Sequence, residues 1–88
     1  MTDLENPDQR WTDWVVQASS AVGVDPDAVD IVEIHHLSKE VAHRLERPLA
    51  PVSTFILGLA VGSSGSADGP ARAALLRRII DTLPEEAG

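Results

Sequence analysis

The sequence predicts an all-α protein, a compact antiparallel four-helix, bundle-like domain that spans residues 1–88 and buries its third helix. Two observations carry this prediction. Helix-start signals that contain a proline occur four times, and an apolar stripe or run of helical length follows each of them. No segment alternates apolar and polar residues as a half-buried strand does. Four helices with short connections favour a bundle over a fold that contains a sheet.

The first helix is expected over about residues 7–22. Asn6 can cap its free amides, and Pro7 suits the first helical position. Trp11 and Trp14 are three residues apart and therefore share one face of this helix. Large aromatic side chains at helical spacing are interpreted as core residues, because their burial contributes much of the energy of a small core.

The second helix is expected over about residues 26–47, either directly from Pro26 or after a short separate turn. Asp25 serves as its cap and Pro26 as its first residue. Pro48 ends it, because the residue before a proline is pushed out of helical geometry. The apolar stripe of this helix consists of Ile31, Ile34, Leu37, Val41 and Leu45.

The third helix, expected over about residues 51–63, has no polar face, so neighbours must surround it. Its Phe55 is therefore expected in the core, where truncation to alanine would cost about 3–5 kcal/mol. Gly58 and Gly62 lie four residues apart and are interpreted as a point of close packing inside the domain. A fourth helix follows over about residues 70–83.

The composition argues against several classes of partner. The net charge is −7, and residues 1–33 account for it with eight acids against one base. An acidic chain with three aromatic residues and no tyrosine lacks the cationic and stacking groups that bind nucleic acid. No apolar run reaches the roughly 20 residues that cross a bilayer. The lack of cysteine and of a basic, signal-like N-terminus favours the cytoplasm.

The polar side of the second helix is one part of the candidate site. At 100° per residue, His36, Glu40 and His43 lie opposite the apolar stripe, and Arg47 continues the same ridge. In the simplest interpretation this ridge is a solvated face, on which Glu40 pairs with His43 or with Arg44 along the helix. A metal site is disfavoured, because His36 and His43 are about 10 Å apart along the helix axis.

The junction between the second and third helices is the other part of the candidate site. His43 and Arg47 approach the first turn of the third helix there, near Ser53 and Thr54. The free amides of a helix N-terminus attract negative charge, so this corner is a candidate site for an anion or an acidic partner. The sequence contains no recognisable nucleophile with its base and no paired acids in a pocket, so we expect neither an enzyme nor a cofactor.

Beyond these local patterns, the stretch KEVAHRLERPLAPVSTFILGLAVG, over residues 39–62, resembles a small uncharacterised bacterial domain. That domain occurs alone or fused behind the molybdenum-cofactor guanylyltransferase, and nearly the whole chain fits it. The chain departs from it in having two tryptophans and an acidic leader. The positions that carry the resemblance are Val41, Ala42, His43, Arg47, Pro48, Ala50, Pro51, Ser53, Thr54, Phe55, Gly58, Ala60 and Gly62.

The resemblance implies a cellular context and assigns no catalytic residue. No glycine-rich nucleotide-binding loop is present, so guanylyl transfer is not carried over. The implied function is a non-catalytic accessory domain in molybdopterin guanine dinucleotide metabolism, which docks on a cofactor-biosynthesis enzyme through the ridge. The alternative is a homo-oligomeric helical domain with an anion-binding corner, because the third helix is more apolar than so small a core requires.

Overall fold

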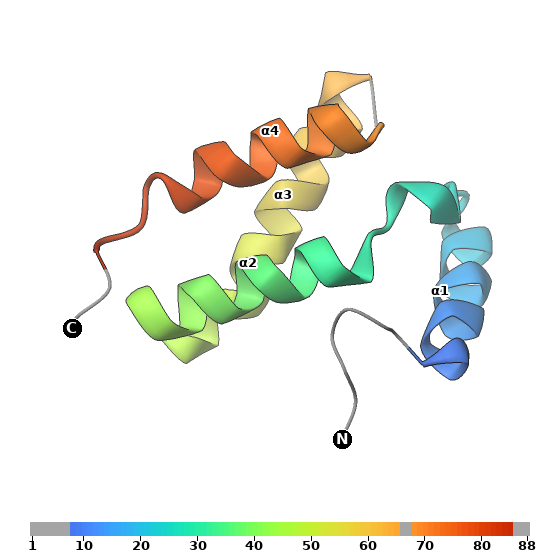
Figure 1. Cartoon of the computed structure of the whole chain (residues 1–88). Coiled ribbons are helices and arrows are strands. Elements are labelled where there is room, and N and C mark those ends of the chain that lie inside the picture. The colour runs from blue at the N-terminus through green and yellow to red at the C-terminus, as the bar shows by residue number, and fades with distance from the viewer. Residues whose placement is uncertain (1–7, 66–67, 86–88) are drawn as a thin grey trace. The chain divides into compact units, whose positions relative to one another are not determined.

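The computed structural model describes residues 8–65 and 68–85, which divide into two compact units between Val32 and Glu33. Each unit is described separately. All regular structure among the described residues is helical and consists of four α-helices and two short 3-10 helices, with no strand (Figure 1). The predicted all-α fold is confirmed, and the single domain over residues 1–88 stays a prediction.

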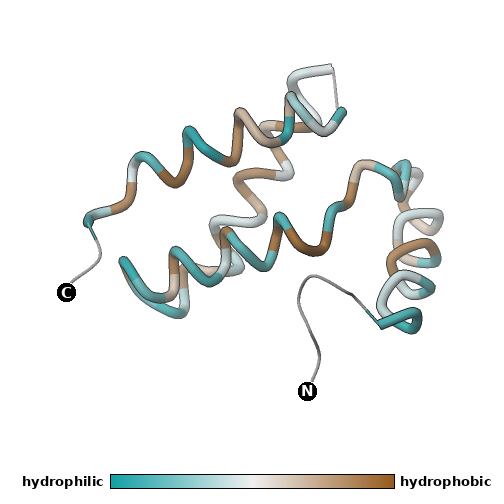
Figure 2. The backbone as a smooth tube through the Cα atoms, in the orientation of Figure 1, coloured by the Kyte–Doolittle hydropathy of each residue, from teal (hydrophilic) through white to brown (hydrophobic). Residues whose placement is uncertain are grey.

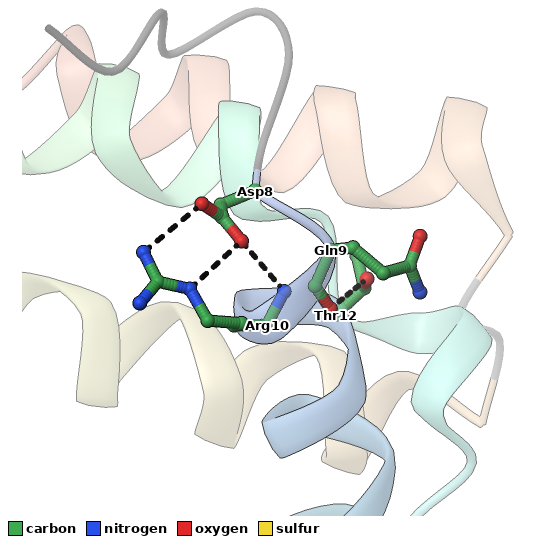
Figure 3. A network of polar contacts seen from close by, with 4 residues as sticks. All are labelled: Asp8, Gln9, Arg10 and Thr12. Atoms are coloured by element: carbon green, nitrogen blue, oxygen red, sulfur yellow. Dashed lines mark hydrogen bonds and ion pairs between the residues drawn. The ribbon is translucent and has the colours of Figure 1, made fainter.

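In the first unit, helix α1 spans Gln9–Val22 and begins one residue after its cap, Asp8. The expected cap and start, Asn6 and Pro7, lie outside the described residues. A carboxylate oxygen of Asp8 accepts the backbone N–H of Arg10 at 2.7 Å, and the guanidinium of Arg10 donates to the same carboxylate at 3.2 Å (Figure 3). The side-chain hydrogen bond from Arg10, followed by the backbone one, lowers the pKa of the Asp8 carboxyl.

Helix α1 ends at Gly23, whose φ of 74° lies in the left-handed region that glycine adopts without strain. The short 3-10 helix η1, Pro26–Ala28, is the element that packs on α1 in this unit. So short a partner covers little of α1, and Trp14 remains 65% exposed. The interpretation of Trp14 as a core residue is therefore wrong, whereas Trp11 is half-buried.

The segment expected as one helix over residues 26–47 is divided into three. Val29 has extended backbone after η1, so helix α2 spans Ile31–Arg44 and its residues from Glu33 onward belong to the second unit. Extended backbone recurs at Glu46, with φ −151° and ψ 141°, one residue earlier than expected. The 3-10 helix η2, Arg47–Leu49, then leads into α3, so the second helix ends before Arg47.

Two further helices complete the second unit. Helix α3 spans Ala50–Ser64, and helix α4 spans Gly69–Ile80, where Asp68 caps the first turn by accepting the N–H of Ala71 at 2.8 Å. Helices α2, α3 and α4 all contribute to the buried core of this unit. The core consists of Leu37, Val41, Leu57 and Leu76, with Val61, Leu75, Ile79, Ile80 and Leu83 packed against it.

One ion pair and one hydrogen bond show how α2 and α4 run. Near the start of both helices, Arg72 of α4 lies 3.1 Å from Glu33 of α2. Near the end of both helices, Arg44 of α2 donates to the carbonyl oxygen of Pro84 at 2.9 Å. The two helices therefore run in the same direction, and α3 crosses them in the opposite sense (Figure 1). In the described part of the chain, no helix is long and apolar enough to cross a bilayer.

Candidate functional site

Helix α3 is buried on one side only. Ser53 and Leu57 are each 6% exposed, whereas Phe55 on the other side is 66% exposed. We use the name α3 face for the exposed side, which comprises Val52, Phe55, Ile56, Gly58, Leu59 and Gly62. The prediction of a buried third helix is wrong, because its neighbours in this unit lie along a single side. The expected cost of truncating Phe55 in a core does not apply to a ring this exposed.

The two glycines of α3 lie on this open side. A methyl group built on Gly58 or on Gly62 meets no atom within 4 Å, so the predicted close packing of these glycines inside the domain is also wrong. Their bare backbone faces outward beside Phe55 and Leu59. Since seven residues make almost two full turns, Phe55 and Gly62 share nearly the same direction on the helix.

An open apolar depression of about 500 Å³ lies along the α3 face. Thr54 is the one polar residue in its lining, and the hydroxyl of Thr54 already donates to the carbonyl oxygen of Pro51 at 2.8 Å. Helix α3 contains no ionisable side chain, whereas α2 and α4 alternate polar and apolar residues (Figure 2). The depression is lined by Ile34, Pro51, Thr54, Phe55, Gly58 and Leu59.

The residues of the predicted ridge on α2 differ in exposure. His36 and His43 are exposed, as expected. The side chain of Glu40 is 25% exposed, and its carboxylate forms an ion pair with Arg44 at 3.2 Å. This is the pairing along the helix that the solvated-face interpretation expects. The acid of the ridge is therefore paired along the helix, its two histidines are exposed, and a binding role for the ridge stays a prediction.

The contribution of Arg44 to the fold could not be predicted from the ridge pattern. Besides the pair with Glu40, its guanidinium donates to the carbonyl oxygens of Leu83 and Pro84, 39 and 40 residues away. The spacing of Glu40 and Arg44 indicates the ion pair, but nothing local indicates the two distant carbonyls.

The corner between α2 and α3 has fewer free amides than expected. The N–H of Leu49 donates to the carbonyl oxygen of Glu46 at 3.1 Å, and the N–H of Ala50 donates to that of Arg47. The hydroxyl of Ser53 donates to a first-turn carbonyl at 2.6 Å. Arg47 itself is exposed. Anion binding at this corner stays a prediction, with the exposed Arg47 as its clearest support.

Comparison with known proteins places the chain in a family and leaves its activity open. Among the described residues, no group of three His, Cys, Asp or Glu side chains is placed to hold a metal ion. No curated protein and no solved structure matches the chain. One family model matches residues 6–87, and its description is a domain of unknown function. The chain therefore belongs to the DUF6457 family of domains of unknown function.

Proposed function

We propose that the protein is a non-catalytic interaction domain whose α3 face is covered by a protein surface in its working state. The observation that carries this proposal is the exposure of large apolar side chains on a helix without charge, 66% for Phe55 and 56% for Leu59. Contiguous apolar patches beyond a few hundred Å² are uncommon on monomers and mark binding sites. The non-catalytic part rests on the sequence, which contains no recognisable nucleophile with its base.

A site-specific photo-crosslink tests this proposal inside cells. With Phe55→p-benzoylphenylalanine in the full chain, irradiation should join position 55 to a protein, identified by mass spectrometry. The matched control is Arg78→p-benzoylphenylalanine, since Arg78 is an exposed residue of α4 outside the α3 face. We expect a discrete adduct at position 55 and none at position 78. If position 55 gives no protein adduct, or both positions give the same ones, the α3 face is not an interaction surface.

For the cellular context, we propose an accessory role in molybdopterin guanine dinucleotide metabolism, in the cytoplasm. The support is the resemblance over residues 39–62 to a domain fused behind the molybdenum-cofactor guanylyltransferase. The partner enzyme would meet the exposed side chains of His36, His43 and Arg47, none of which belongs to the α3 face. The guanidinium of Arg47 at this corner suits an acidic or phosphate-bearing surface.

Arg47→Ala tests the proposed contact with this enzyme. We expect the variant to retain less guanylyltransferase than the native chain in a co-purification with the tagged protein. Its free energy of unfolding should change by about 0.5 kcal/mol or less, as is usual for exposed positions. Arg78→Ala, which removes another exposed arginine, should leave retention unchanged. Unchanged retention together with a folding defect would make Arg47 a structural residue. If the native chain itself retains no guanylyltransferase, the proposed role in molybdopterin guanine dinucleotide metabolism is contradicted.

A further inference from the structure

We propose that a second copy of this chain covers the α3 face, so that two α3 helices pack against each other about a two-fold axis. This inference rests on the proposed function and names the partner of the same surface. Three properties of the α3 face support a second copy over a different protein: its size, its lack of charge, and the order of its large and small residues.

The size of the face suits a small, reversible dimer. Its four large side chains, Val52, Phe55, Ile56 and Leu59, are 48–66% exposed. At about 100 Å² each, they present roughly 400 Å² per copy, to which Pro51 and the glycine backbone add. Two copies would then bury roughly 1,000 Å², which is near the lower limit for a specific interface. An interface this small favours a weak, reversible dimer over an obligate one.

The charge distribution permits two copies to meet at this face. Helix α3 contains no ionisable side chain, so no like charges oppose each other across the axis. The net charge of −7 arises in residues 1–33, whereas residues 34–88 carry six acids and six bases. A different partner is usually selected by complementary charges around the apolar centre, and the α3 face supplies none.

The order of residues along α3 is complementary to itself. In a two-fold antiparallel pair centred between Gly58 and Leu59, Phe55 of one copy lies opposite Gly62 of the other. In the same register, Leu59 of each copy lies opposite Gly58 of the other. Phe55 and Leu59 therefore each meet bare helix backbone, which lets the two helices approach closely. The empty space around both glycines in the single chain leaves room for these side chains.

Sedimentation velocity on the full chain tests the dimer. Across a dilution series from about 500 to 1 μM, the native chain should pass from dimer to monomer, as a weak, reversible dimer does. A monomer at every concentration overturns the inference. So does an assembly that grows beyond two copies, because a two-fold interface closes after two.

The glycines supply the decisive variants, because dimerisation and folding should respond in opposite directions. Gly58→Ala and Gly62→Ala should each raise the melting temperature of the dilute monomer, since alanine favours a helix more than glycine does and its methyl group meets no atom. The same methyl group would hold two α3 helices apart. We therefore expect the double variant to raise the dimer dissociation constant by about tenfold or more. An unchanged dissociation constant would place the dimer interface elsewhere.

A matched pair of charge variants locates the interface. Leu59→Lys should abolish dimerisation, whereas Val16→Lys in α1 should not, although Leu59 and Val16 are similarly exposed at 56% and 50%. If both variants lose dimerisation equally, or if Val16→Lys alone loses it, the inference is overturned. The photo-crosslink at position 55 separates the two proposals. If the chain is monomeric and position 55 is joined to a different protein, only the dimer is contradicted. If position 55 gives no adduct with any protein, the interaction function itself is contradicted.

Discussion

Leu37→Ala should lower the free energy of unfolding by about 2–5 kcal/mol, because the missing atoms leave a cavity that the surrounding core cannot fill completely. The side chain of Leu37 is 0% exposed, and it belongs to the core that α2, α3 and α4 build together. Urea unfolding followed by circular dichroism measures the loss as a lower midpoint. A chain this small has a thin margin of stability, so Leu37→Ala could prevent folding altogether. Leu37→Met should lower the free energy of unfolding by less than about 1.5 kcal/mol and should still fold.

The control for this prediction is Leu59→Ala, which removes the same atoms from a side chain that is 56% exposed. Measured at a concentration where the chain is monomeric, it should cost about 1 kcal/mol or less. Equal losses for Leu37→Ala and Leu59→Ala would show that both side chains are buried in the folded monomer. That result would contradict the orientation of α3.

Arg44→Ala should cost about 1–3 kcal/mol, because it leaves three polar groups without their donor. The side chain of Arg44 is only 18% exposed, and its guanidinium connects the carboxylate of Glu40 at 3.2 Å with the carbonyl oxygens of Leu83 at 3.4 Å and Pro84 at 2.9 Å. Chemical denaturation measures the loss. Arg44→Lys should recover only part of it, because an ammonium group cannot reproduce the planar fork of the guanidinium.

Two comparisons decide whether this effect belongs to the contacts of Arg44. Arg78→Ala removes an exposed arginine and should change the free energy of unfolding by about 0.5 kcal/mol or less. A double-mutant cycle with Glu40→Gln separates the ion pair from the bonds to the two carbonyls. If Arg44→Ala were as harmless as Arg78→Ala, the connection between α2 and the end of α4 would contribute nothing to stability.

Helix class and several caps and turns could be predicted from the sequence, because they depend on interactions over four residues or fewer. Asp25 accepts the N–H of Asp27 at 2.9 Å, Gly23 adopts the left-handed conformation after α1, and α3 begins beside Pro51. Boundaries were less accurate where two local preferences compete. At the end of α2, the chain leaves helical geometry at Glu46 and enters a 3-10 turn at Arg47. The rule that the residue before a proline leaves helical geometry indicates Arg47 and not Glu46 as the point of departure.

The candidate site could be predicted less well, and Glu40 shows why. Helical spacing indicates its ion pair with Arg44, but the guanidinium of Arg44 also reaches carbonyl oxygens 39 and 40 residues away. A helical wheel assigns a direction to each side chain and contains no information about such a distant partner.

Which side of α3 is buried was decided by tertiary packing alone. Where polar and apolar residues alternate, as in α2, their period indicates which side faces the core, and Leu37 and Val41 are indeed buried. An apolar run such as α3 has no such contrast, so any side could have been covered. Its neighbours in the unit cover the side of Ser53 and Leu57 and leave Phe55 exposed, because two short helices cannot enclose a third.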